Sequence, residues 1–499
     1  MTTRDVKIAV IGSGFAGLGM AIQLRQRGET DFVVLERADE VGGTWRDNHY
    51  PGAACDVQSN LYSFSFAPNP DWPRSYSEQP EIQAYLENTA ARYGVYEHTV
   101  FGADVTAARW DDDAHQWIVS TTAGEFRAQV LISAAGALAD PTYPDIPGLQ
   151  SFEGELMHSA RWDDAVDLDG TRVAVIGTGA SAIQVVPAIQ PRVASIAVYQ
   201  RTAPWIVPRS DRPVKRSAQF LYRHVPLFQK AVRGLLYLFR ELLVVGMAKR
   251  RRMLKPVQKV ARAHLERQVR DPELRRKLTP SYRIGCKRIL LSNDYYPALT
   301  RDNVEVVTDA IREVREHAIV TADGREHEVD TIIFGTGFHV TDMPIGERVR
   351  GRDGRRLVDA WGGSPKAHLG TIVHGFPNLF LLLGPNTGLG HNSVVYMMEA
   401  QVGLVVAALR HLRATGAAAI EPRAEVQAAF VAEMGARARG TVWTSGGCHS
   451  WYLDATGRNS TLWPGSSYTF AKRLSKLRPE EYALTPPPVT APEREPALA

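Results

Sequence analysis

Apolar residues in this chain gather into short runs that predict buried strands, and two of these runs lead straight into glycine-rich turns. The first run, KIAVI at residues 7–11, is followed by Gly12, Gly14 and Gly17. An amphipathic helical pattern comes next, and then a second apolar run, FVVL at residues 32–35. This order of strand, glycine turn, helix and strand is typical of the unit that binds a dinucleotide.

The spacing within the first turn gives each glycine a separate task. Gly12 permits the tight turn, Gly14 lets the backbone approach a pyrophosphate, and Gly17 lets the helix pack closely on the strand. Glu36 stands directly after the second strand, where an acid can hold a ribose 2′-hydroxyl. The segment therefore predicts a site for FAD or NAD. The residues expected at this site are Gly12, Ser13, Gly14, Phe15, Ala16, Gly17 and Glu36.

A second turn of the same kind follows the apolar run RVAVI at residues 172–176. Here the next strand, SIAVY at residues 195–199, leads to Arg201, and no acid stands where Glu36 stood. An arginine at this place suits the 2′-phosphate of NADP, because its planar fork of donors matches phosphate oxygens. The alternative is a solvated cation at the end of a strand. The residues expected at the NADP site are Gly177, Thr178, Gly179, Ala180, Ser181, Ala182, Arg201 and Thr202.

Two dinucleotide sites, one acidic and one basic at the ribose position, indicate the architecture of a flavoprotein reductase. Residues 130–148 and 327–338 are typical of the outward and return crossings between an FAD domain and an NADP domain inserted into it. We therefore predict an α/β fold with two Rossmann-like dinucleotide-binding domains and a helical insert. The expected division is 1–148 and 331–484 for the FAD-binding domain, 149–208 and 280–330 for the NADP-binding domain, 209–279 for a basic helical insert, and 485–499 for a disordered tail.

Composition and charge exclude several other classes of protein. The 499 residues suffice for two or three domains, and 44% hydrophobic and 22% charged residues are ordinary for a soluble globular protein. A net charge of +4 argues against nucleic-acid binding. Cys55, Cys286 and Cys448 lie far apart, which argues against a zinc site or a disulfide and fits a reducing cytoplasm. The N-terminus lacks a signal-peptide layout, and no apolar run reaches the roughly 20 residues that span a bilayer.

Residues 209–259 differ from the rest of the chain, because lysine and arginine are frequent there and are opposed by Asp211 and Glu241 alone. Polar residues at positions 229, 230, 233, 240 and 241 leave a wide apolar stripe on a predicted helix. One interpretation is a helical cap over the substrate pocket, with the stripe buried against the protein. The other is a peripheral contact with a membrane surface through residues 220–252. Both interpretations point to a hydrophobic substrate.

Several longer motifs resemble those of the type I Baeyer–Villiger monooxygenases, a family of flavin-dependent enzymes. FEGELMHSARWDD is similar to the family fingerprint FxGxxxHxxxW, with His158 and Trp162 at its two characteristic positions. The resemblance extends over nearly the whole chain, from Ile8 to about Pro464. The other matching segments are GGTWRDNHYPGAACD at 42–56, GCKRILLSNDYYPAL at 285–299, GFPNLFLLLGPNTGLGHNS and SWYLDATGRNSTLWPG.

The resemblance implies an NADPH- and O₂-dependent FAD monooxygenase that inserts an oxygen atom next to the carbonyl of a small apolar ketone, giving an ester or lactone. Arg288 matches the family's arginine, which stabilises a C4a-peroxyflavin, and Asp56 matches the acid that pairs with it. The alternatives are an S- or N-oxygenating flavin monooxygenase and an NADPH-dependent flavin reductase. The resemblance also implies FAD contacts from Thr44, Trp45, Asp56, Tyr62 and Val105, and an NADP contact from Lys287.

Four further residues receive an interpretation from the resemblance and their positions. His158 and Trp162 lie between the two predicted domains and either set domain orientation or form a packed connector. Cys55 and Cys286 stand directly before Asp56 and Lys287, and we take them as small buried packing residues. No metal site is expected, and the oligomeric state stays open. The predicted location is the cytoplasm, with the membrane surface as an option for the insert.

Overall fold

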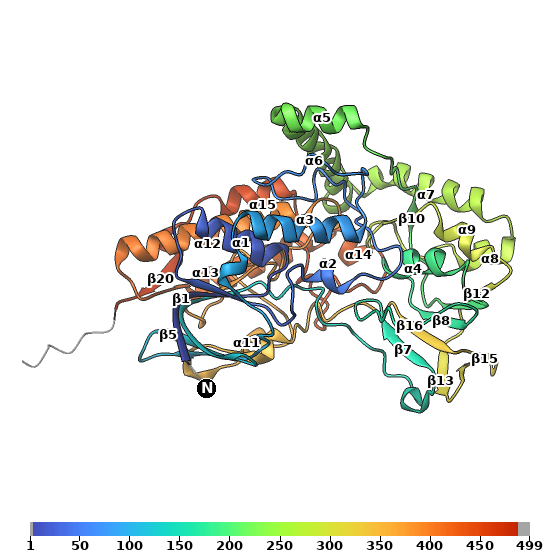
Figure 1. Ribbon diagram of the computed structural model, residues 1–499, viewed down its shortest axis with the longest axis horizontal. Coiled ribbons are helices and arrows are strands. Elements are labelled where there is room, and N and C mark those ends of the chain that lie inside the picture. The colour runs from blue at the N-terminus through green and yellow to red at the C-terminus, as the bar shows by residue number, and fades with distance from the viewer. Residues whose placement is uncertain (1–2, 488–499) are drawn as a thin grey trace, which may run out of the picture.

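The computed structural model describes residues 3–487 and builds them around two large β-sheets, one for each glycine turn (Figure 1). The first is a mixed sheet in which parallel pairing joins β18, β6, β1, β2 and β3, while β4 and β5 extend it by antiparallel pairing and β17 pairs with β4. Its strands are β17 (Val349–Arg350), β4 (Val105–Asp111), β5 (Gln116–Thr121), β6 (Gly124–Ser133), β1 (Thr3–Ile11), β2 (Phe32–Leu35), β3 (Thr99–Val100) and β18 (Leu379–Leu381).

The second large sheet is parallel throughout and carries the second glycine turn after β8. Its order is β12 (Val304–Val307), β9 (Ser195–Tyr199), β8 (Arg172–Ile176), β16 (Thr331–Phe334) and β7 (Glu155–His158). The predicted domain boundary at residue 331 falls too early, because β16 pairs with β7 and β8 and so belongs to this sheet. The fingerprint segment that follows residue 151 supplies β7, the edge strand.

Three smaller sheets complete the strands of the described chain. They are β13 (Ile311–Arg315), β14 (Ala318–Thr321) and β15 (Glu326–Glu328), then β10 (Ile206–Val207) with β11 (Leu290–Leu291), and β19 (Ala419–Pro422) with β20 (Tyr482–Thr485). The predicted return crossing at residues 327–338 carries the end of β15 and the whole of β16. Thr485 was predicted to begin the tail, but it closes β20 opposite Ala419. Residues 488–499 of the predicted tail lie outside the described residues.

The helices cover the two sheets and the space between them (Figure 1). Those outside the insert are α1 (Phe15–Arg25), α2 (Thr44–Asp47), α3 (Gln79–Arg92), α4 (Ala182–Ile189), α9 (Tyr295–Leu299), α10 (Ile345–Arg348), α11 (Leu357–Trp361), α12 (Val394–Thr415), α13 (Ala424–Ala438), α14 (Val442–Ser445) and α15 (Ser467–Leu474). Short 3₁₀ helices are η1 (Tyr96–His98), η2 (Leu149–Ser151), η3 (Arg251–Leu254), η4 (Arg352–Gly354) and η5 (Pro479–Glu481).

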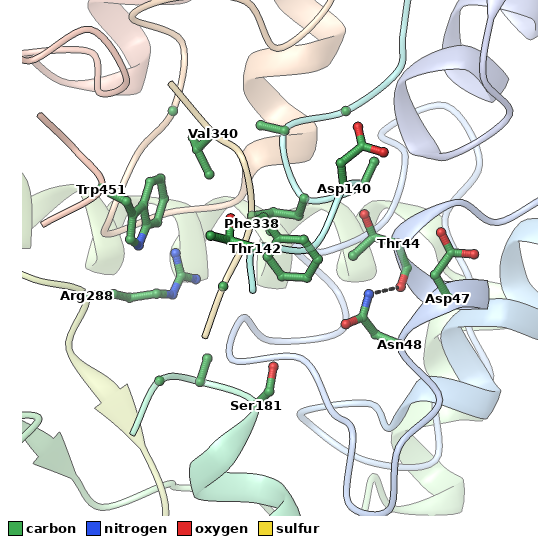
Figure 2. A pocket seen from close by; sticks show the side chains of 18 of the residues that line it. Thr44, Asp47, Asn48, Asp140, Thr142, Ser181, Arg288, Phe338, Val340 and Trp451 are labelled. Atoms are coloured by element: carbon green, nitrogen blue, oxygen red, sulfur yellow. Dashed lines mark hydrogen bonds between the residues drawn. The ribbon is translucent and has the colours of Figure 1, made fainter. Parts of the chain in front are cut away.

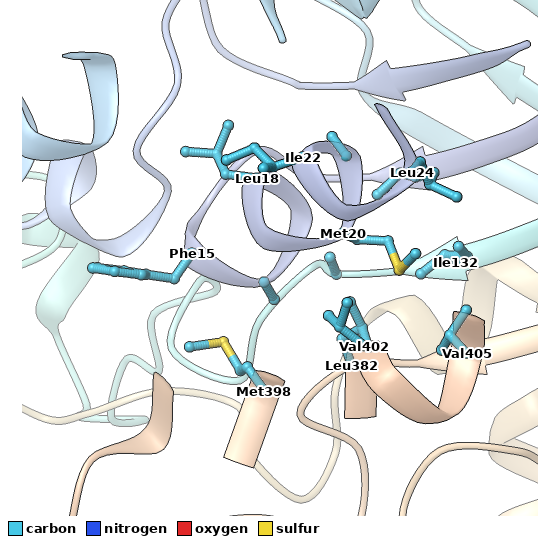
Figure 3. Packing of buried hydrophobic residues seen from close by; sticks show 14 of the residues in the cluster. Phe15, Leu18, Met20, Ile22, Leu24, Ile132, Leu382, Met398, Val402 and Val405 are labelled. Carbon is cyan, nitrogen blue, oxygen red and sulfur yellow. The ribbon is translucent and has the colours of Figure 1, made fainter. Parts of the chain in front are cut away.

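Helix α1 forms the centre of the largest hydrophobic core (Figure 3). Met20 of α1 packs in the same cluster as Ile132 of β6 and Val402 and Val405 of α12. The helix is buried on nearly every side, whereas its sequence pattern predicted an amphipathic helix. Burial on both faces holds the first glycine turn rigidly at the carboxyl end of β1, where ligands bind in parallel sheets.

The insert contains α5 (Arg216–His224), α6 (Pro226–Ala248), α7 (Lys255–Gln268) and α8 (Pro272–Lys277), and α5 and α6 stand at the top of the molecule in Figure 1. The prediction that its apolar stripe is buried against the protein is wrong. Leu235, Leu238 and Phe239 of α6 are 68%, 62% and 67% exposed. Across residues 3–487, no helix combines the length and the apolar character needed to cross a membrane.

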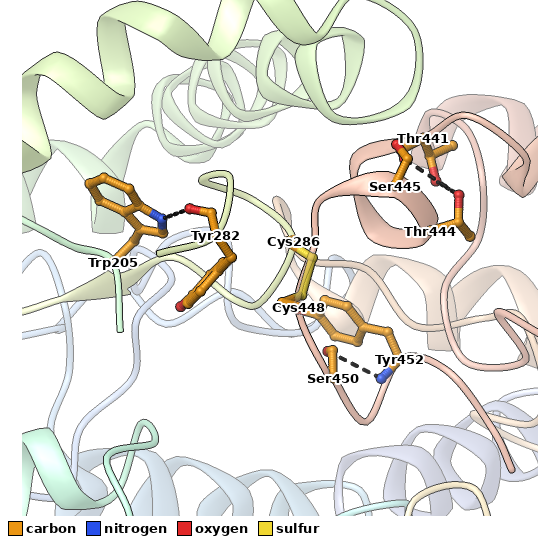
Figure 4. Close-up of a disulfide and its surroundings, with 9 residues drawn as sticks. All are labelled: Trp205, Tyr282, Cys286, Thr441, Thr444, Ser445, Cys448, Ser450 and Tyr452. Carbon is orange, nitrogen blue, oxygen red and sulfur yellow. Dashed lines mark hydrogen bonds between the residues drawn. A yellow bond between two sulfur atoms is a disulfide. The ribbon is translucent and has the colours of Figure 1, made fainter. Parts of the chain in front are cut away.

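Two of the three cysteines are joined, contrary to the sequence-based expectation (Figure 4). Cys286 and Cys448 form a disulfide with Cα atoms 6.1 Å apart, although 162 positions separate them along the chain. Cys286 is thus not a free packing residue, whereas Cys55 is free and buried as expected. The inference of a reducing compartment depended on unpaired cysteines, so the disulfide removes that support.

Candidate active site

Both glycine turns line a cavity of about 1160 Å³ between the two large sheets (Figure 2). The predicted residues on its wall are Gly12, Ser13, Gly14, Phe15, Ala16, Glu36, Thr44, Trp45, Asp56, Tyr62, Val105, Gly177, Thr178, Gly179, Ala180, Ser181, Arg201, Thr202, Lys287 and Arg288. Gly17 and Ala182, the third positions of the two turns, lie behind the wall. Residues 209–279 contribute nothing to the wall, so the insert is not a cap that lines this cavity.

The first turn brings the start of α1 against the backbone of the turn itself. A Cβ atom at Gly17 would lie 1.9 Å from the carbonyl oxygen of Gly12, a distance that excludes every side chain. The close approach directs the first N–H groups of α1 toward the cavity, where they are available to an anion. Gly17 therefore acts through packing, as its place in the motif predicted.

Glu36 follows β2 and is held by neighbours on its own side of the cavity. It accepts hydrogen bonds from the backbone N–H and the hydroxyl of Ser13 at 2.9 and 2.7 Å, and lies 3.1 Å from the guanidinium of Arg46. Burial opposes ionisation, but the charge of Arg46 and the bonds from Ser13 outweigh it and hold the pKa of Glu36 below its usual value. The carboxylate is therefore negative at neutral pH and accepts hydrogen bonds.

Asp56 and Arg288 form the ion pair that the family resemblance implied, although 232 positions separate them along the chain. Nε and Nη2 of Arg288 donate to the two carboxylate oxygens of Asp56 at 2.6 and 2.7 Å. The charge of Asp56 raises the pKa of Arg288 against the effect of burial. Burial favours the neutral acid, yet the charge of Arg288 keeps the pKa of Asp56 below its usual value. Both groups stay ionised at neutral pH, and 31% of the Arg288 side chain remains exposed.

The segment around Asp56 is supported by the insert. Nη2 of Arg240, on α6, donates to the backbone carbonyl of Asp56 at 2.9 Å. The neighbouring Cys55 thiol is buried, and burial together with the charge of Asp56 raises its pKa to about 12. Cys55 is therefore a neutral thiol on the cavity wall and not an activated nucleophile.

Arg201 and Lys287 place two positive charges at the end of the cavity near the second turn. Both line the wall, and within residues 3–487 neither side chain has a carboxylate at ion-pair distance. Burial and the charge of Arg201 lower the pKa of Lys287, so the two cations are close enough to repel each other. Nζ of Lys287 lies 5.3 Å from the ring centre of Tyr282. An anion placed between the two cations would relieve their repulsion.

His158 lies in the second sheet and Trp162 packs against that sheet, and neither residue is on the cavity wall. His158 closes β7, and its Nδ1 accepts the backbone N–H of Ala160 at 3.1 Å. Burial lowers the pKa of His158 to about 4, which leaves the ring neutral at physiological pH. Trp162 packs in one core cluster with Tyr50 and Ala53 from the first domain and with strands of the second sheet.

Several wall residues were not identified from the sequence. Asp140 and Phe338 come from the two crossing segments, and Trp451 comes from the C-terminal motif (Figure 2). Arg37 lies beside Glu36 and donates to Asp140 at 3.0 Å. The crossing segments were predicted to pass between the two domains. Their polar and aromatic residues could therefore have been predicted to line a cavity there. In Figure 2 the side chains of Arg288 and Trp451 point into the same part of the cavity.

Comparison with known proteins relates the whole chain to a family of monooxygenases. Residues 9–219 match the pyridine nucleotide-disulphide oxidoreductase family model. The Baeyer–Villiger monooxygenase of Streptomyces coelicolor is 51% identical over 97% of this chain and 93% of its own length. The Baeyer–Villiger monooxygenase of Pseudomonas aeruginosa is 49% identical over 98% of this chain and 93% of its own length.

Solved structures with the same fold extend the comparison. Cyclohexanone monooxygenase from Rhodococcus sp. Phi1 bound to NADP⁺ has a TM-score of 0.86 at 30% identity, covering 97% of this chain and 100% of that one. A steroid monooxygenase bound to NADP has a TM-score of 0.86 at 31% identity, with 96% and 99% covered. OTEMO in complex with FAD and NADP has a TM-score of 0.88 at 27% identity, with 97% and 100% covered.

Proposed function

Because this chain belongs to the Baeyer–Villiger monooxygenases, we propose that Arg288 and Asp56 form the charged centre of its reaction. The enzyme uses FAD and NADPH to insert one oxygen atom of O₂ beside the carbonyl of a ketone. The observation that carries the proposal is the two-bonded ion pair on the wall of the cavity that both glycine turns share. Bound FAD would supply the activated oxygen, and the side chains supply charge, orientation and exclusion of water.

The first turn and its neighbours fit FAD. The N-terminus of α1 faces the cavity at Gly14, which suits a pyrophosphate, and the ionised Glu36 suits a ribose hydroxyl. Thr44 and Trp45 begin α2 on the same wall. We assign the flavin side of the cavity to Thr44, Trp45, Asp56, Tyr62 and Val105, all of which line it.

The second turn fits NADPH. The start of α4 and the turn before it provide backbone N–H groups for a pyrophosphate. Arg201 and Lys287 are two cations on the adjoining wall that have no carboxylate at ion-pair distance among residues 3–487, and a 2′-phosphate would offset both charges. We therefore assign the 2′-phosphate to Arg201 and Lys287, with Thr202 beside them.

Arg288 is proposed to act on the reacting oxygen atoms as a permanent donor. Asp56 occupies its Nε and Nη2 atoms, so the guanidinium plane is fixed and Nη1 is available to the cavity. A donor fixed in this way stabilises the negative charge that develops on the ketone oxygen, at a gain of roughly 3 to 4 kcal/mol. Asp56 orients the guanidinium and offsets its cost of burial.

We propose a small apolar ketone as the substrate. Phe338, Val340 and Trp451 present apolar side chains to the same cavity as Arg288. Such walls favour a carbon skeleton and leave Arg288 to bind its one polar group, the carbonyl oxygen.

The role of Arg288 can be tested by comparing NADPH oxidation with ester formation from a cyclic ketone. In Arg288→Ala, flavin reduction by NADPH should continue, whereas ester formation should fall roughly 100-fold or more and hydrogen peroxide should be released. Arg288→Lys keeps a charge but loses the two-bonded geometry, and should recover part of the activity. Arg356→Ala removes an exposed arginine paired with Asp359 and serves as the control. Normal ester yield in Arg288→Ala would remove Arg288 from the reaction.

A further inference from the structure

Helix α6 directs Arg233, Arg240 and Glu241 toward the protein and a row of apolar side chains toward solvent, the reverse of an ordinary surface helix. Leu227, Leu235, Leu238, Phe239 and Leu242 are 62% to 75% exposed. Their spacing places them on one side of the helix, because successive residues of an α-helix turn by about 100°. We call these five residues the outer face of α6. An exposed apolar surface of this kind is uncommon on a protein that stays free in solution.

Hydrogen bonds on the opposite side fix the rotation of α6. Nη1 of Arg233 donates to the backbone carbonyls of Asn60 and Ser63, both at 2.9 Å. Glu241 accepts a hydrogen bond from Nδ2 of Asn392 at 2.8 Å, and Arg240 holds the backbone of Asp56 as described above. Turning the outer face inward would break these bonds and leave buried polar groups without partners. The outward direction of the leucines is therefore built into the fold.

The segments that flank the outer face are strongly basic. Of the two acids in residues 209–259, Asp211 pairs with Arg74 and Glu241 is directed inward, so neither balances these cations. Arg223 of α5 pairs with Asp71. The other exposed basic residues on α6 and in the segments on either side of it are Lys215, Arg216, Lys230, Lys249, Arg250, Arg252, Lys255 and Lys259. Further exposed apolar residues lie just before α6: Phe220 and Leu221 on α5, and Val225 directly after it.

We propose that the outer face of α6 binds the surface of a bilayer that contains anionic phospholipids, with the helix lying in the plane of the membrane. An apolar face between clusters of cations matches the two regions of such a surface. Leucine and phenylalanine enter the boundary of the acyl chains, and lysine and arginine contact the phosphates of the headgroups. The described chain has no membrane-spanning helix, so the contact is peripheral. The cavity wall excludes residues 209–279, so the contact leaves the cavity itself unobstructed.

The charge of the surface favours lipid over a second copy of this chain. Two outer faces packed together would bring the basic flanks of both copies close to each other, and like charges at such short range are unfavourable. An anionic membrane neutralises the same cations. The proposal therefore also requires that binding weakens as salt is added.

Co-flotation of the full-length enzyme, loaded with FAD, with lipid vesicles tests the proposal. The enzyme should float with vesicles of phosphatidylcholine and phosphatidylglycerol, remain in solution with phosphatidylcholine alone, and be released by high salt. The quadruple variant Leu235→Gln, Leu238→Gln, Phe239→Ser and Leu242→Gln should lose at least roughly tenfold in affinity for these vesicles. Lys249→Gln with Arg250→Gln and Lys255→Gln should lose the preference for phosphatidylglycerol.

Controls separate a membrane contact from general stickiness and from misfolding. Tyr468→Ser with Leu484→Gln removes exposed apolar groups elsewhere, 58% and 38% exposed, and should bind vesicles like the wild type. All variants should keep the flavin content and the NADPH oxidation rate of the wild type. Failure of the wild type to float with phosphatidylglycerol vesicles would overturn the proposal. So would a wild-type dimer that the quadruple variant converts to a monomer, because the outer face would then be a contact between copies.

Discussion

The hydroxyl of Tyr50 donates a hydrogen bond of 2.9 Å to Oε1 of Gln184, and this bond joins the two nucleotide-binding halves of the enzyme. Gln184 lies on α4, directly after the second glycine turn, and its Nε2 donates to the backbone carbonyl of Ala54 at 3.0 Å. Tyr50 and Ala54 belong to the segment that leads to Asp56. One side chain of α4 thus sets the distance between the second turn and the charged centre.

We expect Gly52→Ala to separate the two halves. Gly52 has φ +82°, and a Cβ atom there would lie 2.8 Å from the carbonyl oxygen of Gln184, so alanine must push α4 away. The free energy of unfolding should fall by about 1 to 3 kcal/mol, and a smaller share of oxidised NADPH should yield ester. Thermal unfolding and the ratio of ester to NADPH measure the two effects.

Gly28→Ala is the matched control, because Gly28 also has positive φ, +73°, but has nothing within 4 Å of the added Cβ. This variant should lose stability through backbone strain but should keep the wild-type ratio of ester formed to NADPH oxidised. An equal ratio of ester formed to NADPH oxidised in the wild type and in Gly52→Ala would show that the contact with α4 is structural only.

Replacing Arg201 should change the choice between NADPH and NADH. The proposed 2′-phosphate contact predicts that Arg201→Gln raises the KM for NADPH roughly 10- to 100-fold, since a hydrogen bond between charged groups is lost. The KM for NADH should change little. Arg192→Gln, which removes an exposed arginine paired with Asp169 in the same domain, is the control. A similar rise in both KM values would assign Arg201 to a part of the cofactor that NADH shares.

The buried ring of His158 should make stability depend on pH. Its pKa is lowered from 6.5 to about 4, so the unfolded chain binds this proton more readily than the folded one. The contribution of the neutral ring is present in full above pH 6.5 and is lost as the pH falls toward 4, up to roughly 3 kcal/mol. His158→Asn keeps an acceptor for the N–H of Ala160 and should flatten this part of the curve. An unchanged slope of unfolding free energy against pH would show that His158 does not titrate there.

Reduction of the Cys286–Cys448 disulfide should destabilise the segment that carries Arg288. The bond closes a loop with a sequence separation of 162, so its removal should cost roughly 2 to 4 kcal/mol of unfolding free energy. Added dithiothreitol should lower the melting temperature of the wild type and of Cys55→Ser equally, because Cys55 is free. The variant with both Cys286→Ser and Cys448→Ser should melt at the lower temperature and no longer respond. A melting temperature of wild type that dithiothreitol leaves unchanged would contradict the expected effect.

Local patterns in the sequence determined the two nucleotide-binding units. The strands before Gly12 and Gly177, the turns themselves and the opposite charges of Glu36 and Arg201 are all set within some thirty residues. Such features depend on backbone geometry and on side-chain periodicity, which act over short distances along the chain. The candidate pair Arg288 and Asp56 came from the resemblance of longer motifs to a known family.

Contacts between distant segments were decided by the tertiary structure alone. The helical period of α6 identified its apolar stripe, but the direction of the stripe depended on Arg233 finding its partners at Asn60 and Ser63. In the same way, the pairing of Cys286 with Cys448 depended on the path of the chain between them. Periodicity states which residues share a side of a helix, whereas the partners available to each side exist only once the chain has folded, and they decide which side is buried.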